Sequence, residues 1–182
     1  MTDTDLRGRS RERLADWLAD LRERYAAFER VEKRWELAPE AYERDRERIA
    51  AGENGGAGIW VTNDAGEVLL VRNEGEEGWA DPGGKREAGE SFEAAARREV
   101  REETAVEATI TGVREAHVLE LVDETDLDRP ALASLIVIFD GDYTGGDPRP
   151  REGEIAAAEW IASPPECVLY PEVRDRPYPA SE

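Results

Sequence analysis

Several residue types are scarce in this 182-residue chain, and each shortage excludes a class of protein. Cys167 is the only cysteine, so no disulfide can form within the chain, which agrees with a reducing compartment. No apolar run is long enough to span a bilayer, and the opening Met1-Thr2-Asp3 is acidic and polar, unlike a signal peptide. We therefore expect a cytoplasmic protein without membrane contact.

Positive charge is also scarce. The chain has 24 Lys and Arg against 43 Asp and Glu, a formal net charge of −19, and Lys33 and Lys85 are its only lysines. A surface this negative disfavours binding to nucleic acid or to anionic lipid. It is similar to the surface of a protein from an extreme halophile, and an ordinary acidic protein from an arginine-rich genome is the alternative that composition leaves open.

The first 54 residues form an expected helical extension. Apolar side chains recur at a seven-residue interval, at Leu14, Leu21, Phe28 and Trp35, which predicts helix over residues 6–38. Pro39 breaks this pattern, and a second helix is expected from about Glu40 to Ala50. Three partners for the apolar stripe stay open: the rest of the chain, the second helix, or a second subunit in a homodimer.

Residues 55–182 have the pattern of one α/β domain. A Gly-rich linker at 51–58 leads to a hairpin pattern, and a single central helix is predicted from about Ser91 to Thr104. Expected strands cover 59–61, 68–71, 106–122, 131–140 and 156–161, and a short terminal helix is expected over 166–175. Strands on both sides of one helix predict a mixed sheet with helices packed on it.

The central helix carries the candidate chemistry. Glu99, Glu102 and Glu103 share one face, and that face continues the apolar one begun by Phe92 and Ala96. Three acids near a helix C-terminus oppose the helix dipole at roughly 0.3–1 kcal/mol each. Clustered carboxylates are the ligands that Mg²⁺ or Mn²⁺ prefers, so a metal site is one reading. A salt-bridged helix in an acid-rich chain is the other, and the helix alone leaves both open.

The residues around this helix resemble the signature of the Nudix hydrolase family. The match runs through Gly84, Glu90, Arg98-Glu99-Val100 and Glu102-Glu103, and ends at Ala105-Val106. The preceding Trp79-Ala80-Asp81-Pro82-Gly83-Gly84 resembles the lead-in of that family. Two positions depart from the pattern. Ala105 replaces the glycine that ends the helix, and an alanine in the left-handed conformation there would cost roughly 1 kcal/mol. Asp81 replaces an apolar residue. For Asp81 we expect exposure in an altered strand, or else an added carboxylate near the site.

The resemblance implies an α/β/α sandwich that hydrolyses a pyrophosphate bond in a nucleoside diphosphate derivative. It implies that Glu99, Glu102 and Glu103 ligate Mg²⁺, or Mn²⁺, and that Arg98 and Glu90 orient the loop and the helix. A spacing of eight residues would allow a Glu90–Arg98 ion pair. Gly83 and Gly84, with Trp79, would face the small-molecule nucleotide.

Other candidates have weaker claims. Glu154 is a candidate further ligand or base, ahead of Glu152 and Glu120, and each has solvated carboxylate as its alternative. Trp60 and Trp79 could stack on a base, but packing is the safer interpretation, and the single histidine, His117, is expected to be packed or exposed. Two further hypotheses stay open: a non-catalytic nucleotide-sensing module, and an interaction protein that acts through the helix at 6–35.

Overall fold

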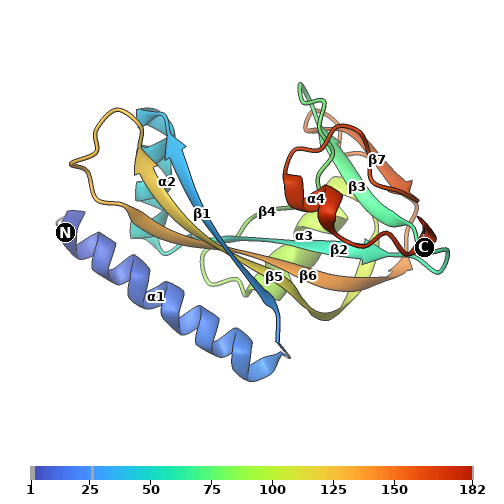
Figure 1. Cartoon of the computed structure of the whole chain (residues 1–182), viewed down its shortest axis with the longest axis horizontal. Helices are drawn as coiled ribbons and strands as arrows, with labels where there is room; N and C mark the ends of the chain where they lie inside the picture. Colours follow the sequence, from blue (N-terminus) through green and yellow to red (C-terminus); the bar gives the residue numbers. More distant parts are fainter. Residues whose placement is uncertain (1–2, 26, 182) are drawn as a thin grey trace.

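The protein is built on one seven-stranded mixed sheet. The computed structural model describes residues 3–25 and 27–181. The strands lie in the order β1-β5-β6-β2-β3-β7, and β4 pairs with β2 (Figure 1). They are β1 (Glu29–Leu37), β2 (Gly56–Thr62), β3 (Val68–Asn73), β4 (Gly83–Lys85), β5 (Glu107–Asp123), β6 (Leu132–Gly145) and β7 (Ile155–Ile161). The helices are α1 (Asp3–Arg24), α2 (Pro39–Ala51), α3 (Phe92–Thr104) and α4 (Pro171–Asp175), followed by the 3₁₀ turn Pro179–Ser181.

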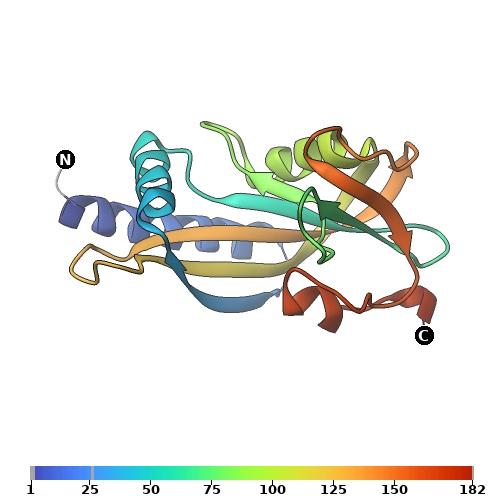
Figure 2. The same ribbon diagram turned by 90° about the horizontal axis from the view of Figure 1, so that it is seen from above.

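Alternating side chains of β6 divide the core between the two faces of the sheet. Leu135, Val137 and Phe139 belong to the cluster formed with α1 and α3, whereas Ile136 and Ile138 point to the opposite face. On that opposite face, Ile138 packs with Val173 of α4 and with Tyr178. Figure 2 shows α3 and α4 on opposite sides of the sheet. The predicted mixed sheet with flanking helices and an N-terminal helix is thus confirmed.

The predicted helix over 6–38 is wrong at residues 29–37, which form β1. This strand pairs in parallel with β5, from Glu29 opposite Glu115 to Leu37 opposite Asp123. Exposed charged residues alternate along β1 with partly buried ones, which is the period of a strand. The seven-residue recurrence of apolar residues continues from Leu14 and Leu21, which lie on helix α1, to Trp35, which lies on strand β1. It therefore concealed the period of the strand.

The N-terminal segment packs on the same sheet as the rest of the chain. Leu18 and Leu21 of α1 enter the cluster beneath β6 and α3. Close to the end of α1, the Tyr25 hydroxyl donates a hydrogen bond to Glu93 of α3 at 2.7 Å. Leu6 of α1 joins Tyr42 and Ile49 of α2 in a second cluster. Of the three partners considered for the apolar stripe, the structure shows contacts with the sheet and between the two helices.

Two other elements differ from the sequence-based expectation. The hairpin of β2 and β3 pairs only at Thr62 and Val68, because β3 then diverges to pair with β7. The terminal helix is confined to Pro171–Asp175, shorter than the predicted 166–175. None of the helices in the described part of the chain is long and apolar enough to cross a membrane.

Candidate active site

The strand β4 lies directly over the carboxylates of α3. The backbone N–H of Gly83 donates a hydrogen bond to Glu103 Oε2 at 2.9 Å. A side chain at Gly84 would meet the carboxylate of Glu99. Gly84 therefore allows the backbone of β4 to approach a buried acid without a side chain between them, whereas a side chain at Gly83 would meet Ala57 and Gly58 of β2.

The helix α3 begins and ends with specific caps. Ser91 precedes it and accepts a hydrogen bond from the N–H of Ala94, as an N-cap residue does. Ala105 ends it in the left-handed conformation, with φ 58°, so alanine adopts here the geometry that glycine favours. The backbone N–H groups of Arg149 and Arg151 donate to the carbonyls of Thr104 and Glu103. Hydrogen bonds from this loop therefore satisfy two backbone carbonyls in the last turn of the helix, which helps to hold the acids of that turn in place.

An ion pair joins the loop before α3 to the helix itself. Arg98 Nε and Nη2 donate to the two carboxylate oxygens of Glu90, both at 2.9 Å. The same guanidinium reaches the Lys85 carbonyl at 3.0 Å and Glu99 Oε1 at 2.8 Å. These hydrogen bonds lower the pKa of Glu90 and raise that of Arg98, so both stay charged. One arginine thus fixes β4, the loop and a carboxylate relative to one another.

The carboxylates of α3 differ in burial and in acidity. Glu99 and Glu103 are 9 % and 5 % exposed, whereas the side chain of Glu102 is 41 % exposed. Burial raises the pKa of Glu103 to about 8, helped by the charges of Glu99, Glu154 and Asp81 and opposed by the Gly83 hydrogen bond. Burial also raises the pKa of Glu99, against the effect of Arg98. Burial thus disfavours the charged forms of Glu99 and Glu103, and a cation bound beside them would stabilise those charged forms.

Arginines supply the positive charge near these acids. Arg151 lies 3.5 Å from Glu102 Oε2 and 3.0 Å from Glu154 Oε2, and Arg98 lies 3.5 Å from Glu102. With the side chains in these positions, no group of three or more acidic, histidine or cysteine side chains within residues 5–25 and 27–180 converges on one point for a metal. The donor chemistry nevertheless fits Mg²⁺, because all four candidate ligands are carboxylates that share one region of charge.

Asp81 is not exposed, contrary to one expectation. Its side chain is 9 % exposed and forms an ion pair with the buried Arg176. Its charge contributes to the raised pKa of Glu103, which agrees with the other expectation, an added carboxylate near the site. Arg176 also contacts Glu115, to which His117 is hydrogen-bonded at 2.7 Å, so a buried network links β5 to the C-terminal segment.

The remaining candidates lie elsewhere. Trp60 is 1 % exposed and packs edge-on against Tyr178, and Trp79 lies next to the guanidinium of Arg72. Glu120 pairs with Arg34 on the sheet surface. Glu152 is exposed in the loop before β7, and Cys167 is exposed.

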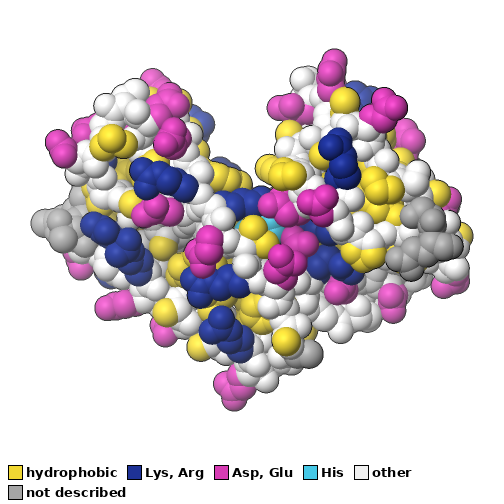
Figure 3. Space-filling view, in the orientation of Figure 1, with side chains coloured by type: hydrophobic (Ala, Val, Ile, Leu, Met, Phe, Trp, Pro, Cys, Tyr) yellow, Lys and Arg dark blue, Asp and Glu magenta, His cyan; other side chains and the backbone are white. Residues whose placement is uncertain are grey.

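A cavity of about 300 Å³ opens on the face of the sheet opposite α3, and sequence reasoning missed it. Figure 3 shows the molecule hollowed between the α2 side and the α4 side. The cavity is lined by Gly83, Gly84 and Lys85 of β4, by β1 and α2, and by the C-terminal Tyr170 and Arg176. The sequence feature that could have indicated the cavity is the scarcity of lysine, because both lysines of the chain line it.

A family model for the NUDIX domain matches residues 53–174. The chain belongs to the Nudix hydrolase family. A Nudix relative from Bacillus subtilis (strain 168), assigned provisionally as an 8-oxo-dGTP diphosphatase, is 31 % identical over 115 residues, which cover 63 % of this chain and 70 % of the relative.

Two solved structures have a fold similar to that of this chain. A Nudix hydrolase from Nitrosomonas europaea has a TM-score of 0.55 at 17 % identity, covering 68 % of this chain and 67 % of its own. A UDP-X diphosphatase has a TM-score of 0.51 at 19 % identity, covering 97 % of this chain and 90 % of its own. Its coverage indicates that the fold similarity includes the N-terminal segment.

Proposed function

We propose that this Nudix hydrolase cleaves a pyrophosphate bond in a nucleoside diphosphate derivative, with a divalent metal bound by α3. The observation that carries the proposal is the burial of Glu99 and Glu103 beneath the glycines of β4. Glu99 is paired with Arg98, as an acid of a salt-bridged helix would be, so Glu103 is the acid that distinguishes the two interpretations. Glu103 instead contacts a backbone N–H and has a raised pKa, which favours a role for its charge in binding a cation.

The roles of the residues follow from their positions. Glu99, Glu102 and Glu103 would hold Mg²⁺, or Mn²⁺, with Glu154 as a further ligand. Such a metal would polarise a phosphate oxygen and help to activate water. Arg98, bound to Glu90 and to the Lys85 carbonyl, keeps β4 at a fixed distance from the helix. Gly83 and Gly84 allow a phosphate to approach the backbone. Trp79 lies next to Arg72 and is not one of the described residues that line the cavity. This favours a packing role for Trp79 over contact with a nucleobase.

The relatives suggest the order in which substrates should be tested. The assignment of the Bacillus subtilis relative places oxidised purine nucleoside triphosphates first. Nucleotide sugars come next, because a UDP-X diphosphatase shares this fold, and ADP-ribose is tested with them.

A substrate panel tests the proposal. Purified protein is incubated with 8-oxo-dGTP, the common nucleoside triphosphates, nucleotide sugars and ADP-ribose, each with Mg²⁺ and each with excess chelator, and phosphorylated products are separated by ion exchange. We expect cleavage of at least one compound with Mg²⁺ and none in chelator. Nucleotide binding by calorimetry without any cleavage would instead support the alternative, a nucleotide-sensing module.

A further inference from the structure

The cavity and the α3 carboxylates share β4 as a common border. Gly83 and Gly84 line the cavity, and they also lie over Glu103 and Glu99. The two glycines of β4, which carry no side chains, therefore border both the α3 carboxylates and the cavity. The floor of the cavity is apolar, formed by Leu119 and Leu121 of β5 and by Ile136 and Ile138 of β6.

The N-terminal segment supplies one wall of this cavity. Lys33 and Trp35 come from β1, and Asp45, Arg48 and Ile49 come from α2. All five precede the residues matched by the Nudix model, which begin at 53. The cavity is therefore completed by a part of the chain that lies outside the family domain.

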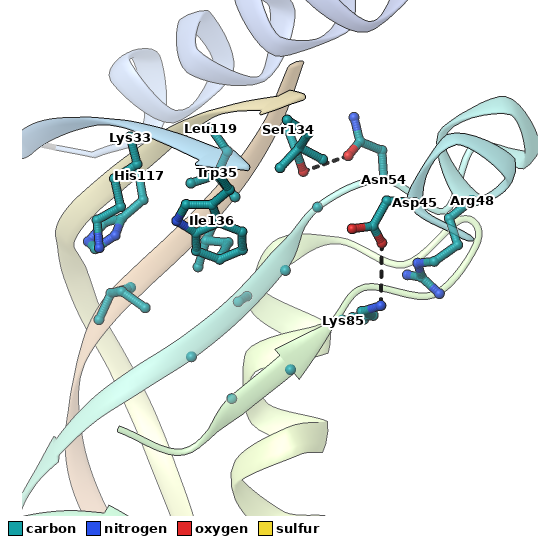
Figure 4. Close-up of a pocket in the computed structure, with 18 of the residues that line it drawn as sticks. Lys33, Trp35, Asp45, Arg48, Asn54, Lys85, His117, Leu119, Ser134 and Ile136 are labelled. Atoms are coloured by element: carbon teal, nitrogen blue, oxygen red, sulfur yellow. Dashed lines mark hydrogen bonds and ion pairs between the residues drawn. The ribbon is translucent and has the colours of Figure 1, made fainter. Parts of the chain in front are cut away.

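Trp35 differs from the other four tryptophans of the chain. Trp17 packs edge-on against Phe92, Trp60 against Tyr178 and Trp160 against Tyr143, and Trp79 lies next to Arg72. Within the described residues no ring or cation is recorded against the indole of Trp35, which lies beside Leu119 and Ile136 at the cavity (Figure 4). The indole is partly buried against the cluster that contains Leu119 and Leu121, and it also lines the cavity, so a ligand in the cavity would contact it.

The polar side chains around Trp35 are largely paired with one another. The Ser134 hydroxyl donates to Asn54 Oδ1 at 2.6 Å, Lys85 lies 3.4 Å from Asp45, and Lys33 lies 2.8 Å from Glu172 (Figure 4 shows the first two pairs). Paired groups offer few free hydrogen bonds to the edge of a base. The apolar floor and the indole are therefore the main surfaces that a planar ring would contact.

We propose that Trp35 is a specificity-determining residue that stacks on the nucleobase of the substrate, so that the N-terminal segment forms part of the active site. The inference rests on the proposed function, because phosphates bound at α3 are what bring a base to the cavity. Stacking on an indole depends on the π-face that every base has, so it favours nucleosides over base-free phosphates and tolerates both purines and pyrimidines.

Binding of non-cleavable probes tests this role separately from catalysis. Three probes are titrated with Mg²⁺ by calorimetry: α,β-methylene-ADP, α,β-methylene-UDP and base-free methylenediphosphonate. The variants are Trp35→Leu, which removes the ring, Trp35→Phe, which keeps one, and Trp160→Leu, a matched control outside the cavity. Thermal melts establish that each is folded, and Trp35→Met replaces Trp35→Leu should the latter not fold.

We expect Trp35→Leu to weaken binding of both nucleotides by about tenfold or more, and to leave methylenediphosphonate unchanged. Trp35→Phe should retain most of the affinity, and Trp160→Leu should match the wild type for all three probes. Equal binding of the nucleotides by folded Trp35→Leu and the wild type would overturn the inference, as would an equal loss for all probes. Failure of the wild type to bind any probe with Mg²⁺ would count instead against the proposed function.

Discussion

Gly84 faces the carboxylate of Glu99 so closely that a methyl group on Gly84 would lie 2.5 Å from the Glu99 carboxyl carbon. The Gly84→Ala variant should therefore push aside this carboxylate, the far end of a flexible side chain, while the backbone stays in place. We expect turnover to fall by about tenfold to a hundredfold, with little loss of stability. Gly112→Ala is the matched control, because nothing lies within 4 Å of a Cβ there. Full turnover in folded Gly84→Ala would contradict a catalytic position for Glu99.

Ala105 holds a left-handed conformation that disfavours every residue except glycine and asparagine. Ala105→Gly should raise the free energy of unfolding by up to about 1 kcal/mol and leave turnover unchanged. Ala94→Gly, at an exposed position within α3, should instead lower the free energy of unfolding by about 1 kcal/mol. Denaturant unfolding of both variants measures this reversal of sign. A loss of stability in Ala105→Gly as large as that in Ala94→Gly would refute the strain at this helix end.

The buried pair of Glu115 and Arg176 predicts a specific dependence of stability on pH. Burial alone would raise the pKa of Glu115, but hydrogen bonds from His117 and Arg176 lower it to about 2. A carboxylate with a pKa depressed from about 4.3 in the unfolded chain stabilises the fold above that value, and this contribution is lost as the pH falls toward 2. The wild type should exceed Glu115→Gln in melting temperature at pH 6, and the difference should narrow between pH 4.5 and 2.

Glu120→Gln is the control for that series. Glu120 forms a surface ion pair with Arg34, and its side chain is 43 % exposed. Such pairs contribute little to stability, so its difference from the wild type should stay small and flat with pH. If the difference in melting temperature between the wild type and Glu115→Gln is equally independent of pH, the Arg176 contact does not depress the pKa of Glu115.

The net charge of −19 predicts a dependence of stability on salt. Like charges repel across the folded surface, and ions screen that repulsion. The melting temperature should rise from dilute buffer to molar KCl, and rise by more than in sucrose of equal osmolality. A flat or falling curve in KCl would remove the interpretation of this surface as one adapted to high salt.

Local spacing made α3 predictable from the sequence. Glu99, Glu102 and Glu103 share a face because they are three and four residues apart, and the Glu90–Arg98 pair followed from a spacing of eight residues. Each feature depends on residues close in the chain, so periodicity and elementary geometry were enough to place them.

Contacts between distant residues were not predictable in the same way. Arg176 reaches Glu115 across 61 positions, and no local pattern indicates this pair. Strand β1 was missed because pairing with β5 overrides the helix that its sequence pattern favoured. The position of Trp35 in the cavity follows from that pairing, so the same error hid both the strand and the wall of the cavity.

The central claim is that the acids of α3 exist to bind metal, and turnover against Mg²⁺ concentration in three proteins tests it most directly. They are the wild type, Glu102→Gln, which alters a half-exposed acid, and Glu107→Gln, which alters an exposed acid just beyond the helix. We predict that Glu107→Gln matches the wild type and that Glu102→Gln loses about a hundredfold or more in turnover. Metal-free Glu102→Gln should be as stable as the wild type or more so, since like charges at the helix end are relieved. A Glu102→Gln protein that melts at a lower temperature yet retains full turnover would contradict the account.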